Sequence, residues 1–522
     1  MLWRLCANII HRTRPRLAKE FSTFVSDPRW PGWQAVIGIE VHAQIRSRAK
    51  LFSPSSNSQD ISPNTHVSLF DAAFPGTLPV LNRRCVDLAV RTALALGCDI
   101  HERSSFDRKH YFYADLPSGY QITQKYAPLA RNGRVSVDDT GRIVRIEQIQ
   151  LEQDTAKSTK SPGAEFWHID LNRAGVGLME IVSLPDMRTP EEAGAYVRSL
   201  QAVLRAVGAS DGKMEQGSLR CDVNVSINRE GKPFGTRCEI KNLNSVKFLM
   251  SAILSEVHRH ISLLSSGRSV AQETRGFDEE PVETYTLRSK EDAPDYRYMP
   301  DPNLPPLILT EGYIKQIAKS MPELPHAIRS RLQSQYGISA RDTDILMSIE
   351  SGTDVGFDGE PSKGGAVSYF EQVAKHCDPK VAINWRVPCV LITHELVGQL
   401  VFRDEPFSAN PVTVTAMRDV LSLLKNKTLT GTSAKTLIRH ILNTKTTKPV
   451  AVLVQELSLQ ASSPESLEKL CQNAIDALPQ ESEAVRKGNQ RVLMKLVGRV
   501  MKHSRGTANA KDAAAALKQM LS

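Results

Sequence analysis

Residues 35–45 read AVIGIEVHAQI, an apolar strand that carries a glutamate and a histidine two positions apart. Successive side chains of a β-strand point to opposite faces, so the aliphatic residues share one face while Glu40, His42 and Gln44 share the other. The carboxylate and the imidazole would lie roughly 7 Å apart, close enough to converge on one ion or one substrate. An ordinary half-buried sheet with a solvated polar face produces the same pattern, so this strand alone leaves both interpretations open.

The composition is that of a globular protein with several domains. The chain has 522 residues, of which 41% are hydrophobic and 24% charged, and a net charge of +9. At roughly 150 residues per domain, this length predicts about two to four domains. No apolar run approaches the roughly 18 residues of a membrane span, so we expect no membrane insertion. The positive charge is typical of a protein with an acidic partner such as nucleic acid, although it does not establish one.

The N-terminal segment is basic. Residues 1–24 contain five Arg or Lys residues against a single acid, Glu20. An Arg-rich, acid-poor segment that can form an amphipathic helix is typical of a mitochondrial transit peptide. We therefore expect residues 1–29 to be a transit peptide and the protein to lie in the mitochondrial matrix. A basic disordered tail that binds RNA is the alternative.

The eight cysteines are scattered and form no C-x-x-C pair. Their spacing predicts no zinc site, and in the matrix or cytosol they would remain reduced. Cys221 and Cys238 alternate with apolar residues and are expected to be small core residues.

The chain divides into two parts with different patterns. Residues 34–309 alternate strand-like runs, turns and a few helices, whereas the chain beyond Pro322 is almost wholly helical. We place the boundary in residues 299–309, MPDPNLPPLIL, because four prolines in this span exclude regular structure. The predicted fold class is therefore α+β followed by all-α.

One helix and three further strands define the first part. Residues 189–208 predict a helix with Thr189 as N-cap and Gly208 at its end. Residues 219–227, LRCDVNVSI, predict a strand with one charged face, and so do residues 145–158 and 236–245. The outward residues are mostly acids, bases, His and Asn, a mixture that suits a metal and nucleotide site.

Two loop-rich segments carry further candidate chemistry. Residues 106–124 gather Lys109, a histidine and several tyrosines around a Pro-Ser-Gly turn. Residues 170–186 place Arg173, Gly175, Gly177 and Glu180 together, and the glycines would permit a backbone approach to phosphate. The segment is neither a Walker A motif nor a dinucleotide fingerprint, and each cluster alone is also compatible with a structural turn.

Seven longer motifs occur in order along the chain and together indicate a family. They are VIGIEVHAQI (36–45), FDRKHYFYADLPSGYQI (106–122), DLNRAGVGLMEIVSLPD (170–186), KMEQGSLRCDVNVSI (213–227), EIKNLNS (239–245), ETRGFDEE (273–280) and DYRYMPDPNLPPL (295–307). They closely resemble the B subunit of the aspartyl/glutamyl-tRNA amidotransferases, from about residue 34 to the end. With its basic leader, the chain is similar to the mitochondrial form.

The resemblance implies an activity and partners. It implies a heterotrimer in which the A subunit, an amidase, releases ammonia from glutamine and the small C subunit braces the pair. The B subunit would use ATP and Mg²⁺ to phosphorylate the γ-carboxylate of misacylated Glu-tRNA(Gln), and ammonia would displace the phosphate to give Gln-tRNA(Gln). The implied domains are a cradle over 30–309, similar to glutamine synthetase and guanidino kinases, a helical domain over 310–410, and a YqeY-like helical tail over 411–522 that contacts tRNA.

The resemblance also implies site residues. Glu40 and His42 match the metal-binding Glu-x-His of the family. The remaining candidates are Glu152, Glu180 and Glu215 for the same metal region, Lys109, Arg173 and Lys241 as catalytic partners of phosphate or carboxylate, and Arg173, Gly175 and Gly177 for the nucleotide. An ordinary surface salt bridge is the alternative for each charged member of this set.

The chain departs from bacterial relatives at three places. Those relatives commonly show two adjacent acids where this chain has Glu152-Gln153 and Glu215-Gln216. An amide oxygen can ligate Mg²⁺ without adding charge, and strand alternation favours Glu152 over Gln153 as the ligand. Some relatives also carry zinc cysteines before the FPGTLP turn at residues 74–79, and this chain has none there, so we expect no zinc.

The C-terminal hundred residues predict a basic amphipathic helix. Its apolar stripe is Leu493, Leu496, Val497 and Val500, and its basic residues are Arg491, Lys495, Arg499, Lys502, His503 and Arg505. Such a surface can hold a tRNA backbone with little sequence preference, although a solvated helix face gives the same pattern.

Two other functions remain open from the sequence. One is a glutamine-synthetase-like ligase acting on a free amino acid, against which the basic tail argues. The other is a tRNA-binding scaffold without kinase chemistry, which Gln153 and Gln216 leave open. A glutaminase role is disfavoured because neither a Ser-rich amidase signature nor a Cys-His nucleophile pair is present, so ammonia must come from elsewhere.

Overall fold

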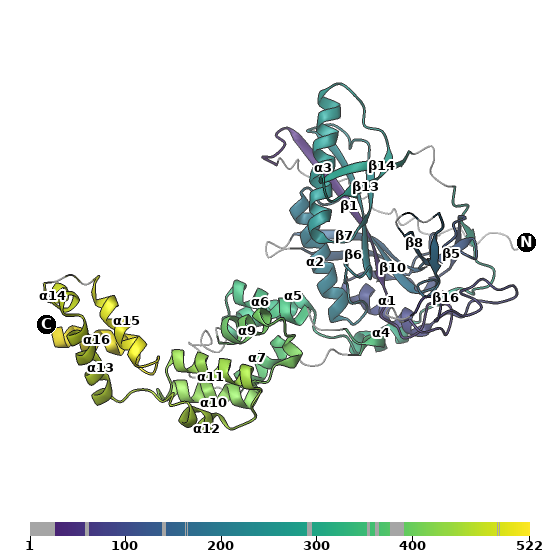
Figure 1. The fold of residues 1–522 in the computed structure, drawn as a ribbon. Helices are drawn as coiled ribbons and strands as arrows, with labels where there is room; N and C mark the ends of the chain where they lie inside the picture. The colour runs from purple at the N-terminus through teal and green to yellow at the C-terminus, as the bar shows by residue number, and fades with distance from the viewer. Residues whose placement is uncertain are drawn as a thin grey trace, which may run out of the picture.

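The structure is a computed structural model that describes residues 27–57, 62–137, 142–161, 163, 165–289, 295–351, 355–360, 365–375, 391–487, 489 and 491–521. Almost all of the expected transit peptide therefore lies outside the described residues. Figure 1 shows a body of sheet and helices near the N-terminus, from which the later helices extend as a curved arm. Within the described ranges, no helix is long and apolar enough to cross a membrane.

The body is built on one large sheet. Among the described residues, nine strands form it in the order β14-β13-β12-β11-β1-β10-β7-β6-β2, antiparallel except for the β12–β13 pair. The strands are β1 (Trp33–Gln44), β2 (Asp99–Ile100), β6 (Ala130–Ser136), β7 (Ile143–Gln153), β10 (Gly177–Ser183), β11 (Leu219–Arg229), β12 (Cys238–Leu243), β13 (Glu273–Asp278) and β14 (Glu283–Ser289). The strand that carries the Glu-x-His pair is thus central, flanked by β10 and β11.

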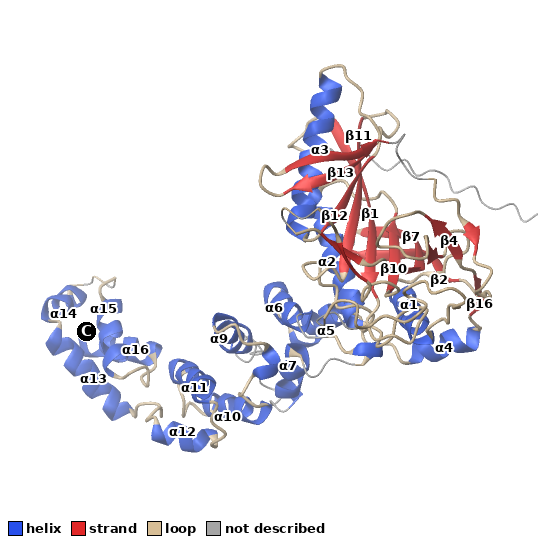
Figure 2. Cartoon of the chain, turned by 45° about the vertical axis from the view of Figure 1, so that its right-hand side comes forward, coloured by secondary structure: helices blue, strands red, loops and turns tan. Residues whose placement is uncertain are grey.

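The main hydrophobic core lies against one face of the sheet. Helices α1 (Arg83–Ala95), α2 (Pro190–Ala206) and α3 (Val246–Ser265) contribute to this core, and α2 and α3 lie side by side against the sheet (Figures 1 and 2). The aliphatic side chains of β1 and β11 point into it, as their alternation predicted, and Cys221 is buried among them. The N-cap prediction for α2 is confirmed, since the Thr189 hydroxyl accepts a hydrogen bond from the Glu192 amide at 3.1 Å.

A small sheet of β4 (Asp107–His110), β5 (Tyr120–Thr123) and β15 (Met299–Pro300) packs beside β7. Another short strand, β16 (Leu307–Ile308), pairs with β3 (Arg103–Ser104), while β8 (Lys157–Thr159) and β9 (His168–Asp170) form a separate hairpin. The prediction that 299–309 holds no regular structure was therefore wrong. Two-residue strands at sheet edges need few backbone hydrogen bonds, so they tolerate neighbouring prolines.

The helices of the arm form two further cores. The second contains α5 (Pro325–Tyr336), α6 (Ala340–Ser351), α7 (Ala366–Lys375), a π-helical turn (Leu391–Leu396), α9 (Val397–Phe402), α10 (Val414–Lys425), α11 (Gly431–Thr444) and α12 (Val450–Glu456). The third contains α13 (Pro464–Ala477), α14 (Pro479–Arg486), α15 (Leu493–His503) and α16 (Ala510–Leu521). Both regions are all-α, as expected.

The packing divides the chain at other positions than the expected 309/310 and 410/411. Helix α4 (Glu311–Lys319) packs on α1 through Ile317, and the Tyr313 hydroxyl donates a hydrogen bond to Asp87, so the first core continues beyond residue 309. Residue 410 falls inside the second core, because α10 packs on α7. Local helical periodicity does not reveal which helices share a core.

The segment between α6 and α7, residues 355–360, contacts the chain at the end of β1. The Arg46 Nε donates to the carbonyl of Val355 at 3.2 Å, and its guanidinium lies 4.3 Å from the centre of the Phe357 ring. Beyond it, Arg48 pairs with Asp358, whose amide donates to the Arg46 carbonyl at 2.8 Å. The strand that carries Glu40 and His42 therefore continues directly into a contact with the helical arm.

Candidate functional site

The polar face of β1 presents the predicted pair beside acids from both neighbouring strands. In the register of the sheet, Glu40 lies opposite Asp222 on β11, and His42 lies opposite Glu180 on β10. The Nε2 atom of His42 is 3.3 Å from Glu40 Oε1 and 3.9 Å from Glu180 Oε2. Two groups share the histidine, Glu40–His42–Asp222 and His42–Glu152–Glu180, and within each the ligand atoms lie within 4.8 Å of one another. We call these five residues the acid cluster.

The acid cluster holds two buried carboxylates that compete for one proton. Glu152 and Glu180 expose only 2% and 8% of their surface. Burial, with the neighbouring charges of Glu152 and Glu40, raises the pKa of Glu180 well above its usual range. Burial alone would also raise the pKa of Glu152, but the charges of Lys109 and His42 lower it on balance. The pair therefore favours an ionised Glu152 beside a protonated Glu180.

One oxygen of the cluster has no hydrogen-bond partner among the described residues. Glu152 Oε2 is buried and unpaired, while its Oε1 lies 3.5 Å from the amide nitrogen of Gln121. Glu180 Oε2, in contrast, accepts a hydrogen bond from Gln150 at 2.6 Å. Because an unpaired buried carboxylate oxygen is costly, this oxygen is a candidate ligand for a cation, or an acceptor for the proton of Glu180.

Two of the predicted lysines border the acid cluster on either side. Lys109 Nζ lies 3.9 Å from Glu152 Oε1, and Lys241 Nζ lies 2.7 Å from Asp222 Oδ2 and 3.1 Å from Glu239 Oε1. Burial would lower the pKa of both lysines, but the adjacent carboxylates raise it on balance. Both ammonium groups therefore stay charged and can bind anionic oxygens.

Arg173 lies at the edge of the site and not in it. Its guanidinium donates to the carbonyls of Thr155 and Ala156 at 2.9 and 2.6 Å, and lies 3.9 Å from Asp154. Asp154 in turn accepts from Arg220 at 2.9 Å. These contacts fix the segment that follows β7, so Arg173 supports the wall of the site.

The structure does not bring Gly175, Gly177 or Glu215 into a phosphate or metal site. The Gly175 amide donates to the Asp154 carbonyl at 2.9 Å, and a Cβ there would lie 2.7 Å from an Asp71 carboxylate oxygen. A Cβ on Gly177 would meet core side chains. Both glycines therefore make room for the chain's own packing. Glu215 is exposed in a turn, where its charge faces Arg205, because the chain reaches the sheet only at the start of β11.

The two glutamines at the departures from bacterial relatives both lie outside the acid cluster. The Gln153 side-chain oxygen accepts a hydrogen bond from the Ile122 amide at 3.4 Å, and Gln216 is exposed. The preference for Glu152 over Gln153 agrees with this geometry, because side chains alternate along β7.

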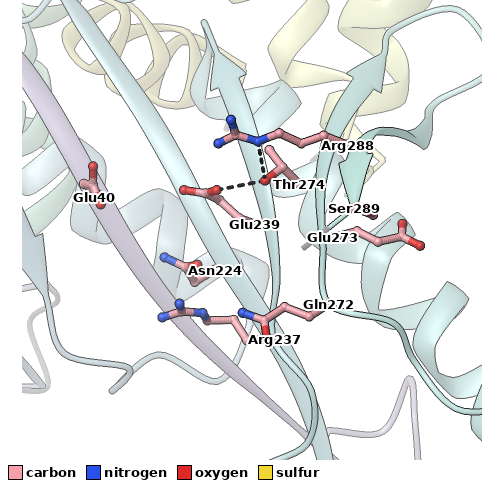
Figure 3. A pocket seen from close by; sticks show the side chains of 9 residues that line it. All are labelled: Glu40, Asn224, Arg237, Glu239, Gln272, Glu273, Thr274, Arg288 and Ser289. Atoms are coloured by element: carbon pink, nitrogen blue, oxygen red, sulfur yellow. Dashed lines mark hydrogen bonds between the residues drawn. The ribbon is translucent and has the colours of Figure 1, made fainter. Parts of the chain in front are cut away.

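A pocket of about 220 Å³ adjoins Glu40 of the acid cluster (Figure 3). The sequence did not predict this pocket. The side chains of Arg237, Glu239 and Arg288 point toward β1 and Glu40, whereas Glu273 points away. The full lining is Glu40, Asn224, Arg237, Glu239, Gln272, Glu273, Thr274, Arg288 and Ser289. Alternation places Asn224 and Glu239 on the polar face, but Arg288 comes from an edge strand whose pairing no local pattern reveals. Two guanidinium groups in this pocket could bind an anionic ligand, and three carboxylates, Glu40, Glu239 and Glu273, line it with them.

A second group of side chains that could bind a metal has its carboxylate paired with arginines. Cys238, Glu256 and His260 are buried between α3 and the sheet. The Glu256 carboxylate pairs with His260 at 2.8 Å, Arg259 at 2.6 Å and Arg275 at 3.3 Å. Because two guanidinium groups already balance the carboxylate, we interpret this set as a structural ion cluster.

Comparisons with known proteins identify the family of the chain. Residues 35–315 match the model of the GatB/GatE catalytic domain, and residues 368–521 match that of the GatB domain. The chain is 54% identical to the B subunit of the mitochondrial glutamyl-tRNA(Gln) amidotransferase of Laccaria bicolor, over 98% of this chain and 97% of the relative. It is 48% identical to the Cryptococcus neoformans mitochondrial protein of that name, over 92% of each chain. The B subunit of the Rickettsia canadensis aspartyl/glutamyl-tRNA(Asn/Gln) amidotransferase is 42% identical, over 91% of this chain and 95% of the relative.

Proposed function

This chain belongs to the family of glutamyl-tRNA(Gln) amidotransferase B subunits, which are ligase-type enzymes, and on that premise we propose that its acid cluster activates tRNA-bound glutamate with ATP. The product would be Gln-tRNA(Gln) for mitochondrial translation. We place the protein in the mitochondrial matrix, in a heterotrimer with the A subunit, an amidase, and the small C subunit.

The proposed reaction has two steps. An oxygen of the glutamate γ-carboxylate attacks the γ-phosphorus of ATP, the bond to the β,γ-bridging oxygen breaks, and ADP leaves. Ammonia from the amidase then attacks the acyl carbon, the bond from that carbon to the phosphate oxygen breaks, and the leaving phosphate takes up the proton that the nitrogen loses, giving the amide and HPO4²⁻. The first step brings two anions together, so the site must supply positive charge.

The acid cluster fits a divalent cation such as Mg²⁺. Its carboxylates are the hard oxygen ligands that Mg²⁺ prefers, and Glu152 offers an unpaired oxygen. Glu40, His42 and Asp222 would hold one ion, and His42, Glu152 and Glu180 would hold the same or a second one. When bound, the metal would neutralise charge on the phosphate and carboxylate oxygens.

The lysines and the pocket arginines perform the remaining binding. Lys109 is placed to hold the glutamate carboxylate near Glu152, and Lys241 keeps Asp222 ionised through its contact at 2.7 Å. Arg237 and Arg288, in the pocket that begins at Glu40, would hold the phosphates of the nucleotide. The observation that carries the proposal is the grouping of His42, Glu152 and Glu180, whose ligand atoms lie within 4.8 Å of one another, together with the unpaired buried oxygen of Glu152.

The tail supplies a grip for tRNA. The predicted apolar stripe of α15 is buried in the third core, which leaves Lys495, Lys502 and His503 on the outer side. Positive side chains of this kind neutralise backbone phosphates, so we expect the affinity for tRNA to fall steeply with salt. The basic surface also favours a tRNA-bound substrate over free glutamate.

The proposal is tested by ADP release in the assembled enzyme supplied with Glu-tRNA(Gln), ammonia and MgATP. The variant His42→Ala should release ADP at least about 100-fold more slowly than wild type, because both ligand groups contain this imidazole. The matched control Glu215→Gln changes an acid outside the cluster and should keep wild-type release. Equal release from wild type and His42→Ala would overturn the proposal and favour a scaffold role, and release with free glutamate as acceptor would favour the free-amino-acid ligase.

A further inference from the structure

The fold places two aromatic segments of the sequence side by side next to the acid cluster. Strand β4 pairs with β15, and the His110 amide donates to the Tyr296 carbonyl at 2.8 Å. This pairing joins residues 107–113 to residues 295–300, which lie far apart in the sequence. None of the tyrosines in these segments has a role in the function proposed above.

Five tyrosines, four from these segments and Tyr126 from the loop after β5, form a continuous row of ring contacts, which we call the aromatic cluster. Its members are Tyr111, Tyr113, Tyr126, Tyr296 and Tyr298. Neighbouring ring centres are 5.7 to 6.4 Å apart, and the ring planes meet at 63° to 76°. Rings that meet at such steep angles do not cover one another face to face, so faces remain on which a planar group can stack.

The outer members of the aromatic cluster are open to solvent. Tyr113 and Tyr126 expose 61% and 63% of their surface. Burial raises the pKa of the inner Tyr298 to about 12, so its ring stays a neutral phenol. A row of aromatic rings with exposed ends is the kind of surface on which nucleic-acid bases stack in single-strand binding proteins.

Two lysines lie beside the aromatic cluster, and one of them also contacts the acid cluster. Lys109 Nζ lies 5.2 Å from the centre of the Tyr296 ring and 3.9 Å from Glu152 in the acid cluster. Lys125 Nζ lies 5.5 Å from the centre of the Tyr298 ring. The phosphate of a nucleotide whose base stacked here could therefore bind Lys109 or Lys125. Lys109 also contacts Glu152, so the nucleotide would lie next to the acid cluster.

We propose that the aromatic cluster binds the adenine base of an adenosine, and that this adenosine is the terminal nucleotide of the acylated tRNA. The inference rests on the proposed function, because the ester on that nucleotide carries the glutamate that must reach the acid cluster. The pocket with Arg237 and Arg288 adjoins Glu40, on the opposite side of the acid cluster from Lys109. The phosphates of ATP could bind in this pocket, apart from the aromatic cluster. The adenine of ATP is the other source of the same base.

The test combines aromatic variants with changes in the base. Tyr113→Ser and Tyr126→Ser remove exposed rings, while Tyr113→Phe and Tyr126→Phe keep the rings without the hydroxyl. Phe402→Ser is the matched control, because Phe402 is 86% exposed on α9 in the second core. The measurements are the KM values for Glu-tRNA(Gln) and for ATP in ADP release, and the affinity of the assembled enzyme for deacylated tRNA with and without its terminal adenosine.

Tyr113 and Tyr126 are the two ends of the row, so one adenine reaches only one of them. We expect one of the two Ser variants to raise the KM for Glu-tRNA(Gln) about 10-fold, with the other Ser variant, the Phe variants and the control close to wild type. Removal of the terminal adenosine should weaken tRNA binding to wild type and have no further effect on the affected Ser variant. A rise in the KM for ATP alone would support the adenine site and assign it to the nucleotide. Unchanged KM values with an unchanged effect of the terminal adenosine would overturn the proposal.

The two proposals fail in different ways. If wild type released no ADP, the proposed function would fail, yet the tRNA affinities would still test the aromatic cluster. If wild type were active and the Ser variants were indistinguishable from Phe402→Ser, only the aromatic inference would fail.

Discussion

The acid cluster around His42 and the buried set around Glu256 are made of the same kinds of side chain and lie on opposite faces of one sheet. Glu256 has a histidine and two arginines around its carboxylate, and each of its oxygens is paired. In the acid cluster, Glu152 keeps an unpaired buried oxygen, and burial together with the neighbouring carboxylates raises the pKa of Glu180 well above its usual range.

The difference teaches that charge balance separates a structural cluster from a functional one. Carboxylates paired with fixed cations stabilise the fold and have nothing left to bind. Carboxylates in excess over cations cost folding stability, and such sites persist where a ligand supplies the missing charge. Ligand-type residues at ligand distances are therefore not sufficient evidence for a metal site.

The largest expected difference between the two clusters is in the rate of ADP release. The variant Glu152→Gln should lower ADP release at least about 100-fold, because it removes the unpaired ligand oxygen. Its urea midpoint at pH 7 should equal or exceed that of wild type, because one of two competing acids is gone. A variant that unfolded much earlier than wild type would show that Glu152 is structural.

For the buried set around Glu256, we expect a loss of stability with almost unchanged activity. The variant Glu256→Gln should lower the free energy of unfolding by about 3 kcal/mol, because it removes the buried carboxylate charge shared by the buried Arg275 and the half-buried Arg259. ADP release per folded molecule should change less than about 2-fold. Denaturant unfolding and activity measured on the same preparation check both values. Lost activity with an unchanged urea midpoint would reverse the assignment of the two clusters.

Metal addition should stabilise only one cluster. Saturating Mg²⁺ should raise the unfolding temperature of wild type by about 2 °C, and chelation with EDTA should reverse the shift. The shift should persist in Glu256→Gln and disappear in Glu152→Gln. Calorimetry of the three proteins measures it, and a shift that depended on Glu256 would contradict the comparison.

The smallest expected effect is in the pH dependence. Burial alone would raise the pKa of Glu256, but His260 and Arg259 hold it below its ordinary value of 4.5. A depressed pKa means that the folded state binds fewer protons, so the stabilisation is present above pH 4.5 and is lost as pH falls. The stability difference between wild type and Glu256→Gln should therefore narrow below about pH 4.5. Urea midpoints at pH 7 and pH 4 measure this change, and a constant difference would show that the carboxylate charge is not its source.

The sequence determined the elements and the face on which each side chain lies. The alternation of residues 35–45 placed Glu40 and His42 together, alternation along β7 preferred Glu152 over Gln153, and the apolar spacing of α15 predicted its buried stripe. These features repeat every two residues in a strand or about every 3.6 in a helix, so local sequence is enough to read them.

Only the tertiary structure decided which elements meet. The register that sets Asp222 opposite Glu40, the arginine pocket at the sheet edge and the pairing of Lys109 with Tyr296 join residues that are far apart in the chain. The packing around Gly175 and the exposed position of Glu215 were likewise invisible to motif and alternation. Strand order and register follow from how all the apolar faces are buried at once, and no local period encodes that choice.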